Sequence, residues 1–365
     1  MTSIKTDRKG NRSVGVHRFS ENPLLTPRDI EPHRRDFEVL GAFNAGVAIY
    51  QNEILLLLRV AERPVQPDQR LIRVPVWDVA REALSVETLH NEHGEYDVSD
   101  PRSVVSKVTG RFAYLSSLSY LRMARSRDGI HFTVDADPFM FPATAYETFG
   151  IEDPRITQIE DEYFITYTSV SPFGVSVSLA VTRDFQTVRR LGVIFPPENK
   201  DVVIFPEKIG NQYFALHRPV PGEIGGPEIW IADSPDLVHW GNHTHLLGVR
   251  SGRWDSRRLG AGAVPLRTKA GWLEVYHAAD KQGRYALGAV LLDLVDPRQV
   301  LARSSHPLLA PEMPYELNGF YGNVVFTCGT AIKEDILHIY YGVADSAMAG
   351  AKISLSEVLS SLSTI

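Results

Sequence analysis

The sequence predicts an all-β protein, a five-bladed β-propeller with an N-terminal extension and a short C-terminal helix. Strand hairpins recur five times, and corresponding points of the repeats lie about 50–65 residues apart over most of the chain. The composition, with 44% hydrophobic and 22% charged residues, is that of a folded globular protein. A chain of 365 residues is long enough to bury a core without disulfides or structural metals.

Each repeat begins with a short apolar strand, a turn and an aromatic-rich strand. Asn, Asp and Gly occupy the turns, where a positive φ costs little. β-Branched and aromatic residues flank the turns, as is typical of strands. The five hairpins span residues 48–60, 156–168, 207–218, 266–278 and 331–342.

A further strand follows each hairpin and runs into a turn rich in Asp, Ser or Pro. These segments span residues 122–132, 179–188, 229–240, 288–300 and 352–362. Five such units favour a propeller. The alternative is a β-sandwich whose hairpins are alike by chance.

Three segments depart from the repeat. Residues 1–35 are polar and basic, and we expect an extension that lies on the surface or reaches a neighbouring subunit, which would allow a homo-oligomer. Residues 36–365 then form a single propeller domain. Residues 64–110 are charged and interrupt the first repeat, so we expect a loop over one end of the propeller that shapes a pocket. Residues 354–362 are compatible with a short helix.

The charge and cysteine content exclude several classes of protein. The chain has 38 basic and 44 acidic residues, a net charge of −6, which gives no reason to expect nucleic acid or acidic membranes as partners. Cys328 stands alone, so it forms neither an intramolecular disulfide nor a cysteine-based zinc site. The N-terminus lacks an apolar core of signal-peptide length, and residues 54–58 form the longest apolar run. We therefore expect a cytoplasmic protein without a membrane span.

Polar residues gather at the ends of the predicted inner strands, which converge on one channel in a propeller. Glu152, Asp153 and Arg155 lie together in IEDPRIT, where the alternative is an Asp–Pro turn with a local ion pair. Lys200 precedes the third hairpin and Arg218 ends it, where the alternative is a solvated turn and a surface charge.

The fourth and fifth repeats add further polar residues. Two arginines precede glycines in DSRRLGAGAVP, His277 and Asp280 end YHAAD, and Tyr285 follows the next turn. Asp345 ends YYGVAD. Carboxylates with aromatic residues suit a sugar, whereas clustered Arg, Lys and His suit an oxyanion such as phosphate.

Several common cofactor and catalytic motifs are missing from the sequence. It contains no P-loop, no GxGxxG after a strand and no GxSxG elbow. Histidines with metal-ligand spacing are also missing, and the pair in GNHTHL is typical of an exposed turn. We expect no nucleotide, metal or other cofactor.

Ten blocks, in order from about residue 22 to residue 345, give the sequence a resemblance to glycoside hydrolase family 130, the β-mannoside phosphorylases and their hydrolytic relatives. The blocks are NPLLTP, AFNAG, FGIEDPRIT, NKDVVIFPEK, LHRP, IWIADSPDLVHWG, LGAGAVP, YHAAD, ALGAVLLDLVDP and YYGVAD. The fold that this resemblance implies is a five-bladed β-propeller, in agreement with the repeats.

The resemblance implies an inverting reaction at a β-mannosyl bond. Its general acid would be Asp153, which passes its proton to the glycosidic oxygen through a sugar hydroxyl. Phosphate would be the nucleophile, attacking from the opposite face to give α-mannose 1-phosphate without an enzymic base. Inorganic phosphate is then a co-substrate rather than a cofactor.

The resemblance also implies a phosphate site of basic residues and a tyrosine. A phosphate dianion beside a sugar needs its charge balanced, and Arg binds phosphate oxygens bidentately. One position carries Arg where the family is expected to have Lys, so the match there falls on either of two neighbours, Arg258 or Arg257. By position, the phosphate-binding residues are Lys200, Arg218, Arg258, His277 and Tyr285.

For the bound mannose, the resemblance suggests Asn44, Arg59 and Asp345 beside Asp153. Tyr114, Tyr120 and the insertion 64–110 are our candidates for the leaving-sugar site. The block AFNAG stands where AFNPG is expected of the β-1,4-acting groups, which favours the branch that acts on β-1,2-mannobiose or β-1,2-oligomannan.

Two other functions remain open at this point. An inverting β-mannosidase would need a carboxylate base roughly 6.5–9.5 Å from the acid, for which Glu207, Glu223 and Glu228 are candidates. A propeller that binds sugar without catalysis is the third reading.

Overall fold

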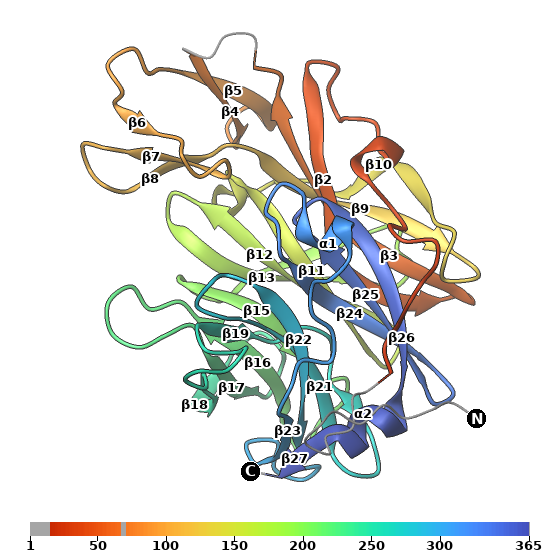
Figure 1. Cartoon of the computed structure of the whole chain (residues 1–365). Helices are drawn as coiled ribbons and strands as arrows, with labels where there is room; N and C mark the ends of the chain where they lie inside the picture. Colours follow the sequence, from red (N-terminus) through yellow and green to blue (C-terminus); the bar gives the residue numbers. More distant parts are fainter. Residues whose placement is uncertain (1–14, 67–70, 365) are drawn as a thin grey trace.

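The computed structural model describes residues 15–66 and 71–364. The chain forms a five-bladed β-propeller, and the colours of Figure 1 follow the blades in sequence order, from red and yellow through green to blue. Each blade begins with a hairpin, and four hairpins lie where predicted, whereas the first strand of blade 3 lies at residues 199–204, before the predicted hairpin 207–218. The first strands β2, β11, β15 and β24 contact one another around the centre.

The blades take their strands in chain order, apart from two additions from the chain ends. Blade 1 consists of β2 (Phe37–Tyr50), β3 (Glu53–Pro64), β9 (Leu118–Ser126) and β10 (Thr133–Met140). Blade 2 consists of β11 (Gly150–Ile159), β12 (Glu162–Ser171), β13 (Gly174–Thr182) and β14 (Arg189–Phe195). A single parallel pairing, Gly150 with Ser119, joins these two blades into one sheet.

The remaining blades follow the same order. Blade 3 consists of β15 (Asn199–Ile204), β16 (Tyr213–Pro219), β17 (Ile229–Ser234) and β18 (Gly241–Leu247). Blade 4 has an interrupted first strand, β19 (Arg258–Gly260) and β20 (Leu266–Arg267), then β21 (Trp272–Ala279), β22 (Tyr285–Leu292) and β23 (Val300–Ser304). Blade 5 consists of β24 (Val325–Lys333), β25 (Ile336–Val343) and β26 (Ala347–Ser354).

Both chain ends add an outer strand. β1 (His17–Arg18) pairs antiparallel with β26, and β27 (Leu362–Thr364) pairs with β23. Leu25 and Ile30 are buried, so residues 15–35 of the predicted extension pack on the propeller of their own chain. Residues 1–14 lie outside the described residues. The predicted C-terminal helix is confirmed as α2 (Leu355–Ser361), which Ser354 caps through the N–H of Glu357.

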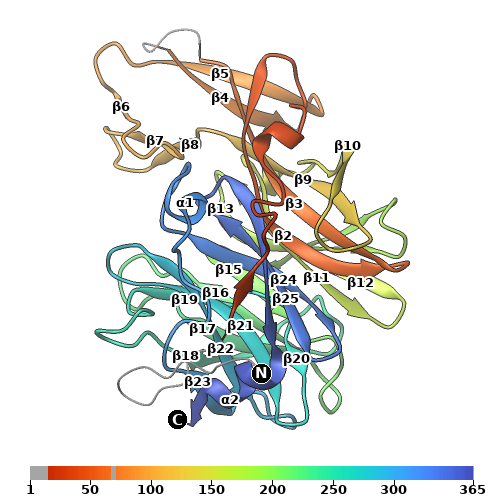
Figure 2. The same ribbon diagram turned by 45° about the vertical axis from the view of Figure 1, so that its right-hand side comes forward.

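The insertion corrects one expectation. It is not a loop but two small sheets, which Figures 1 and 2 both show outside the five blades. A hairpin of β4 (Leu71–Asp78) and β5 (Ala83–His90) is followed by a three-stranded sheet of β6 (Tyr96–Asp97), β7 (Ser103–Ser106) and β8 (Phe112–Leu115). The small sheets nevertheless have an apolar side, because Val74 and Val104 are buried and Trp77 and Leu84 pack against a buried cluster that includes Leu58 of blade 1.

Short helical turns complete the described elements: η1 (Pro27–Asp29), η2 (Ala145–Glu147) and α1 (Pro314–Leu317). In the part of the chain that the structure describes, no helix has the length and apolar character needed to cross a membrane.

One detail of the predicted topology is wrong. Arg218, His277 and Asp345 were placed at the ends of inner strands, whereas they lie on or just after the second strands β16, β21 and β25. They still reach the channel, because the end of each second strand pairs with the start of the first. Lys200 pairs with Arg218, and Gly260 pairs with His277.

Candidate active site

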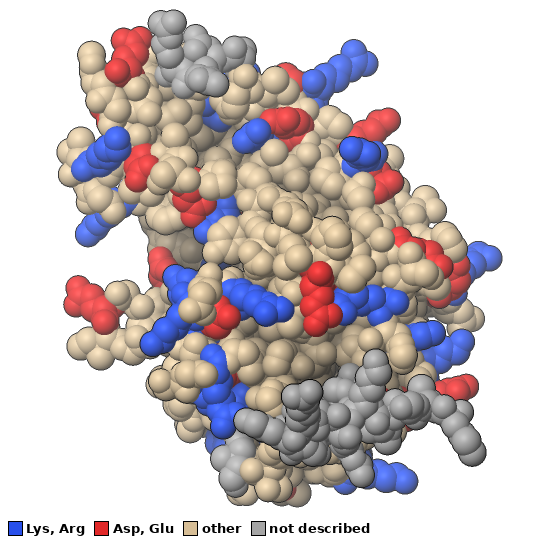
Figure 3. Space-filling model, in the orientation of Figure 1, with Lys and Arg blue, Asp and Glu red and all other residues tan. Residues whose placement is uncertain are grey.

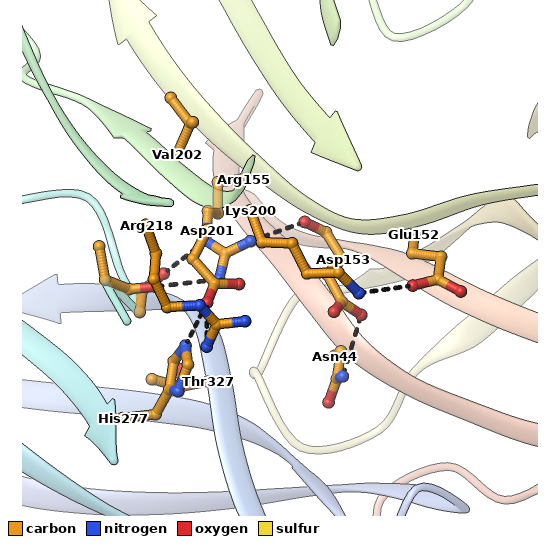
Figure 4. A network of polar contacts seen from close by, with 12 residues as sticks. Asn44, Glu152, Asp153, Arg155, Lys200, Asp201, Val202, Arg218, His277 and Thr327 are labelled. Atoms are coloured by element: carbon orange, nitrogen blue, oxygen red, sulfur yellow. Dashed lines mark hydrogen bonds and ion pairs between the residues drawn. The ribbon is translucent and has the colours of Figure 1, made fainter. Parts of the chain in front are cut away.

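A β-bulge interrupts the first strand of several blades at the same level of the channel. The register shifts at residues 43–46 in β2, 152–155 in β11, 200–203 in β15 and 327–329 in β24. Asn44, Asp153 and Asp201 sit in the first three bulges with φ values of 49°, 48° and 54°. A bulge redirects the side chain, and Asn and Asp tolerate a positive φ better than most residues. The three polar side chains therefore point into one region (Figure 4).

Asp153, the predicted general acid, is 7% exposed and held by two neighbours from blade 1. Asn44 Nδ2 donates to its Oδ1 at 3.0 Å, and Arg59 Nη1 lies 3.2 Å from the same oxygen. Burial by itself would raise the pKa of Asp153, but the charges of Arg59, Lys200 and Arg155 outweigh it and lower the pKa. Before substrate binds, Asp153 is therefore a carboxylate.

Glu152 links the acid to the next blade. Its Oε1 lies 2.8 Å from Arg59 Nη2, and its Oε2 lies 3.7 Å from Lys200 Nζ. Lys200 thus turns toward the sugar-facing carboxylates, although it is adjacent in sequence to Asp201 (Figure 4).

Asp201 is the centre of the basic cluster. Its Oδ1 lies 3.0 Å from Arg155 Nη2, and its Oδ2 lies 2.8 Å from Arg218 Nη1 and 3.2 Å from His277 Nε2. Burial opposes ionisation of Asp201, but the charges of Arg218, His277 and Arg155 hold its pKa well below the usual range. For His277 burial dominates and lowers the pKa.

Arg258 and Tyr285, the two remaining residues predicted to bind phosphate, form a pair. Arg258 Nη1 donates to the Tyr285 hydroxyl at 3.2 Å, and the Tyr285 ring lies 6.2 Å from that of His277 between centroids. Arg258 starts β19, where it pairs with Ala279 of β21, and its contact with Tyr285 is the reason to keep it rather than Arg257 as the candidate. Lys200, Arg218, Arg258, His277 and Tyr285 thus lie on blades 3 and 4 around one end of the channel.

A pocket of about 220 Å³ lies beside these groups, between blade 1 and the insertion. Figure 3 shows the molecule indented between the insertion and the main body, with Lys and Arg side chains along the indentation. The predicted residues Arg59, Lys200 and Asp345 line it with Glu152. Burial and the nearby charges of Asp153 and Glu152 raise the pKa of Asp345 to about 6, although Arg59 and Arg102 oppose the shift.

The two tyrosines expected at the leaving-sugar site lie elsewhere. Tyr120 is fully buried against Glu62 and Arg122, and the Tyr114 ring packs edge-on against Phe149. Neither tyrosine lines the pocket. Its walls include Arg102, Phe112 and Leu115 from the insertion and Phe320 from the segment before β24.

Two charged residues have roles in the site that were not predicted from the sequence. Arg155 donates to the carbonyl oxygens of Asp153, Ala261 and Gly262 as well as to Asp201, so it fixes blades 2, 3 and 4 around the site. For Asp201 the alternative from the sequence was a solvated turn, yet it is 2% exposed. The available signal was the Asn-Lys-Asp order at the start of a strand, where a buried acid follows a base.

The three glutamates considered as hydrolytic bases lie apart from Asp153. Glu207 pairs with Arg267 at 3.1 Å, and Glu228 accepts from His245 and from the N–H of Val249 at 2.8 Å each. Glu223 is exposed in the loop between β16 and β17. Among the described residues, no three His, Cys, Asp or Glu side chains are placed to hold a metal ion.

Comparison with known families agrees with this geometry. The model of glycoside hydrolase family 130, described as β-1,4-mannooligosaccharide phosphorylase, matches residues 97–364. The chain belongs to glycoside hydrolase family 130. The matched region contains the insertion strands β7 and β8 and the last two strands of blade 1. It also contains blades 2, 3, 4 and 5, apart from the N-terminal strand β1.

Individual members of the family are similar over most of the chain. A β-1,2-mannobiose phosphorylase of Listeria innocua serovar 6a is 51% identical, over 96% of this chain and 99% of the relative. A 1,2-β-oligomannan phosphorylase of Thermoanaerobacter sp. strain X514 is 41% identical, over 67% of this chain and 81% of the relative.

Solved structures confirm the fold. The Listeria β-1,2-mannobiose phosphorylase, solved in complex with β-1,2-mannobiose, superposes with a TM-score of 0.93 over 95% of this chain and 99% of its own. A putative glycosidase of Bacteroides thetaiotaomicron shares the fold at 23% identity, with a TM-score of 0.71 over 93% of this chain and 96% of its own.

Proposed function

We propose that this protein is a glycoside phosphorylase that cleaves β-1,2-mannobiose with inorganic phosphate, releasing α-mannose 1-phosphate and mannose. The observation that supports it most directly is the basic cluster of blades 3 and 4 beside a buried, hydrogen-bonded Asp153. The 51% identity to a β-1,2-mannobiose phosphorylase supports the linkage.

In the proposed reaction a phosphate oxygen attacks the anomeric carbon from the α face while the β-glycosidic bond breaks. The departing oxygen receives a proton that originates on Asp153 and passes through a hydroxyl of the mannose. Because Asp153 is a carboxylate before the substrate binds, it must take up this proton during binding. A sugar adds burial around the carboxyl, which raises its pKa.

The remaining side chains divide into two groups. Asn44, Arg59 and Asp345 are placed to bind mannose hydroxyls, since they surround Asp153 or line the pocket. The basic residues of blades 3 and 4 would balance the phosphate dianion, whose desolvation is otherwise costly. No metal or organic cofactor enters this scheme.

The alternative, an inverting β-mannosidase, has less support. It requires a carboxylate base placed to activate water, and Glu207, Glu223 and Glu228 all have other surroundings. A site for phosphate explains the clustered cations, whereas a hydrolase has no use for them. We further propose a cytoplasmic location, where phosphate is available and a lone thiol stays reduced, and leave a homo-oligomer as an expectation.

The decisive experiment is turnover of β-1,2-mannobiose with and without millimolar phosphate, analysing the products for mannose 1-phosphate. We expect turnover only with phosphate, and loss of the phosphate-dependent rate in Arg218→Ala and Arg258→Ala. Free mannose alone, formed equally in both tubes, would contradict the proposal in favour of hydrolysis. Binding without any product would instead indicate a sugar-binding propeller.

A further inference from the structure

We propose that Asp201 is a positioning residue that fixes the phosphate-binding side chains Arg218 and His277 without touching phosphate itself. The inference rests on the proposed function. It goes further by assigning a role to a carboxylate within a site that otherwise collects cations, where a negative charge would weaken anion binding if it served no purpose.

Both carboxylate oxygens of Asp201 face basic side chains. Oδ1 faces Arg155 at 3.0 Å, and Oδ2 faces both Arg218 at 2.8 Å and His277 at 3.2 Å. These partners come from blades 2, 3 and 4, and all four side chains are at least nine-tenths buried. Asp201 therefore joins three blades at the point where the basic side chains converge.

The backbone around Asp201 is shaped for this contact. Its φ of 54° in the bulge of β15 turns the carboxylate toward β19 and β21. Gly260 on β19 faces it, and a Cβ at that position would lie 2.2 Å from Asp201 Oδ2 and 2.6 Å from the His277 ring. Only glycine leaves room there for the carboxylate and the imidazole to meet.

The charges explain why a carboxylate is needed. Two guanidinium groups beside an imidazole repel one another when buried, and long arginine side chains have many rotamers to lose. A fixed carboxylate between them offsets the repulsion and holds each group in one rotamer before phosphate arrives. Phosphate then binds a preformed set of donors, which increases affinity by reducing the ordering that binding requires.

The test is the steady-state kinetics of Asp201→Asn, which keeps the shape and removes the charge. If Asp201 positions the cations, the KM for phosphate rises about tenfold or more, while the KM for β-1,2-mannobiose stays within about twofold. If the negative charge of Asp201 only repelled phosphate, removing that charge would lower the KM for phosphate or leave it unchanged. Either of those results overturns the proposal.

Asp201→Asn leaves the buried charges of Arg155 and Arg218 less compensated, which can prevent folding. A second variant therefore tests the same proposal without changing any charge. Gly260→Ala keeps every charge but pushes the carboxylate away from His277, and we expect the same phosphate-specific rise in KM. An unchanged KM for phosphate in Gly260→Ala overturns the proposal even if Asp201→Asn does not fold. Asp233→Asn, in the same blade but paired with Arg298 and Asn242, is the matched control.

The wild-type assay separates this proposal from the proposed function. If wild type turns over mannobiose without phosphate, the phosphorylase assignment itself fails, and the role of Asp201 fails with it. If wild type requires phosphate but both variants keep its KM for phosphate, only the positioning role of Asp201 is overturned.

Discussion

Three polar side chains reach the candidate active site because each occupies a bulge of a first strand. Asn44, Asp153 and Asp201 all adopt a positive φ, which Asn and Asp accept more readily than β-branched or bulky residues. The bulge turns the side chain out of the regular alternation of the strand and toward the channel. The same bulge in blades 1, 2 and 3 thus supplies the amide of Asn44, the acid Asp153 and the carboxylate of Asp201, which lies between the basic side chains.

The first prediction concerns the acid. Asp153→Asn preserves the size, the positive φ and most contacts of the side chain, but it cannot deliver a proton. We expect kcat to fall by about 100-fold or more, as general acids contribute ~10²–10⁴-fold, with mannobiose binding retained by calorimetry. Asp161→Asn, exposed in the turn between β11 and β12, should match wild type. Near-normal kcat in Asp153→Asn would exclude it as the acid.

Single residues differ in how well the sequence predicts them. Asp153, Arg218 and His277 lie in motif blocks at strand ends, and the structure brings them to one region. Asp201 was not identified because its partners are distant in sequence; Arg155 lies 46 positions away. The Asn-Lys-Asp order can mark a buried acid, but the distant partners of that acid follow from blade packing and not from a local pattern.

Among the elements, the insertion shows how a charged segment can fold. Its charge and its position between two strands of the first repeat suggested a loop, yet Trp77 and Leu84 of its hairpin pack against a buried cluster. The three-stranded sheet nevertheless brings Arg102 into the pocket wall, where its guanidinium lies 4.3 Å from the centre of the Tyr321 ring. The same guanidinium is paired with Asp100, whose Oδ2 lies 2.7 Å from Arg102 Nη2.

The second prediction tests the insertion as part of the sugar site. Arg102→Ala removes a cation–π contact of about 0.5–2 kcal/mol that ties the insertion to the segment before β24. We expect a several-fold higher KM for mannobiose and an unchanged KM for phosphate. Arg111→Ala, an exposed position in the same insertion, controls for loss of charge. A change in the phosphate KM alone would show that the insertion does not serve the sugar.

The third prediction concerns the N-terminal strand. Arg18 Nε donates to Glu316 at 2.7 Å, and Glu316 is a fully buried residue of α1, the turn that precedes Phe320. Burial opposes ionisation of Glu316, but the hydrogen bond from Arg18 is among the effects that lower its pKa. The pair therefore stabilises the fold above the pKa of the unfolded glutamate, and this stabilisation is lost as the pH falls through the folded value.

We accordingly expect Arg18→Ala to lower the free energy of unfolding by about 1–3 kcal/mol at pH 7 and by less in acid. Thermal unfolding at pH 7 and pH 4 measures both values. Arg28→Ala, exposed in the same segment, is the control. An equal loss at both pH values would show that the contact acts through packing rather than charge.

For the whole molecule, the five-bladed arrangement follows from repeats that are visible in the sequence, whereas its closure does not. Hairpins have strong local signals, and four of the five form where expected, while the first strand of the third starts earlier, at Asn199. The strands that complete blades 4 and 5, β27 and β1, have three and two residues. Segments this short have no periodicity, and their partners are set only when the circle of blades has closed.

The centre of the circle contains a carboxyl group whose proton is linked to folding. Glu274 on β21 is fully buried, and its Oε1 accepts the N–H of Gly262 at 2.8 Å. Burial raises the pKa of Glu274 well above the usual range, and Arg155 opposes this only in part. Folding therefore takes up a proton at neutral pH, so this group destabilises the fold increasingly as the pH rises above the unfolded value, by at most about 1.4 kcal/mol per pH unit.

The fourth prediction follows from the raised pKa of Glu274. Glu274→Gln keeps an oxygen for the Gly262 N–H and removes the ionisable group, so its free energy of unfolding relative to wild type should increase from pH 5 to pH 8. Urea unfolding of both proteins at the two pH values gives this difference, with Glu92→Gln as an exposed control. A difference that is constant with pH would mean that Glu274 is ionised in the folded protein. Arg155 would then be paired with two carboxylates, and the charge balance proposed for the phosphate site would have to include Glu274.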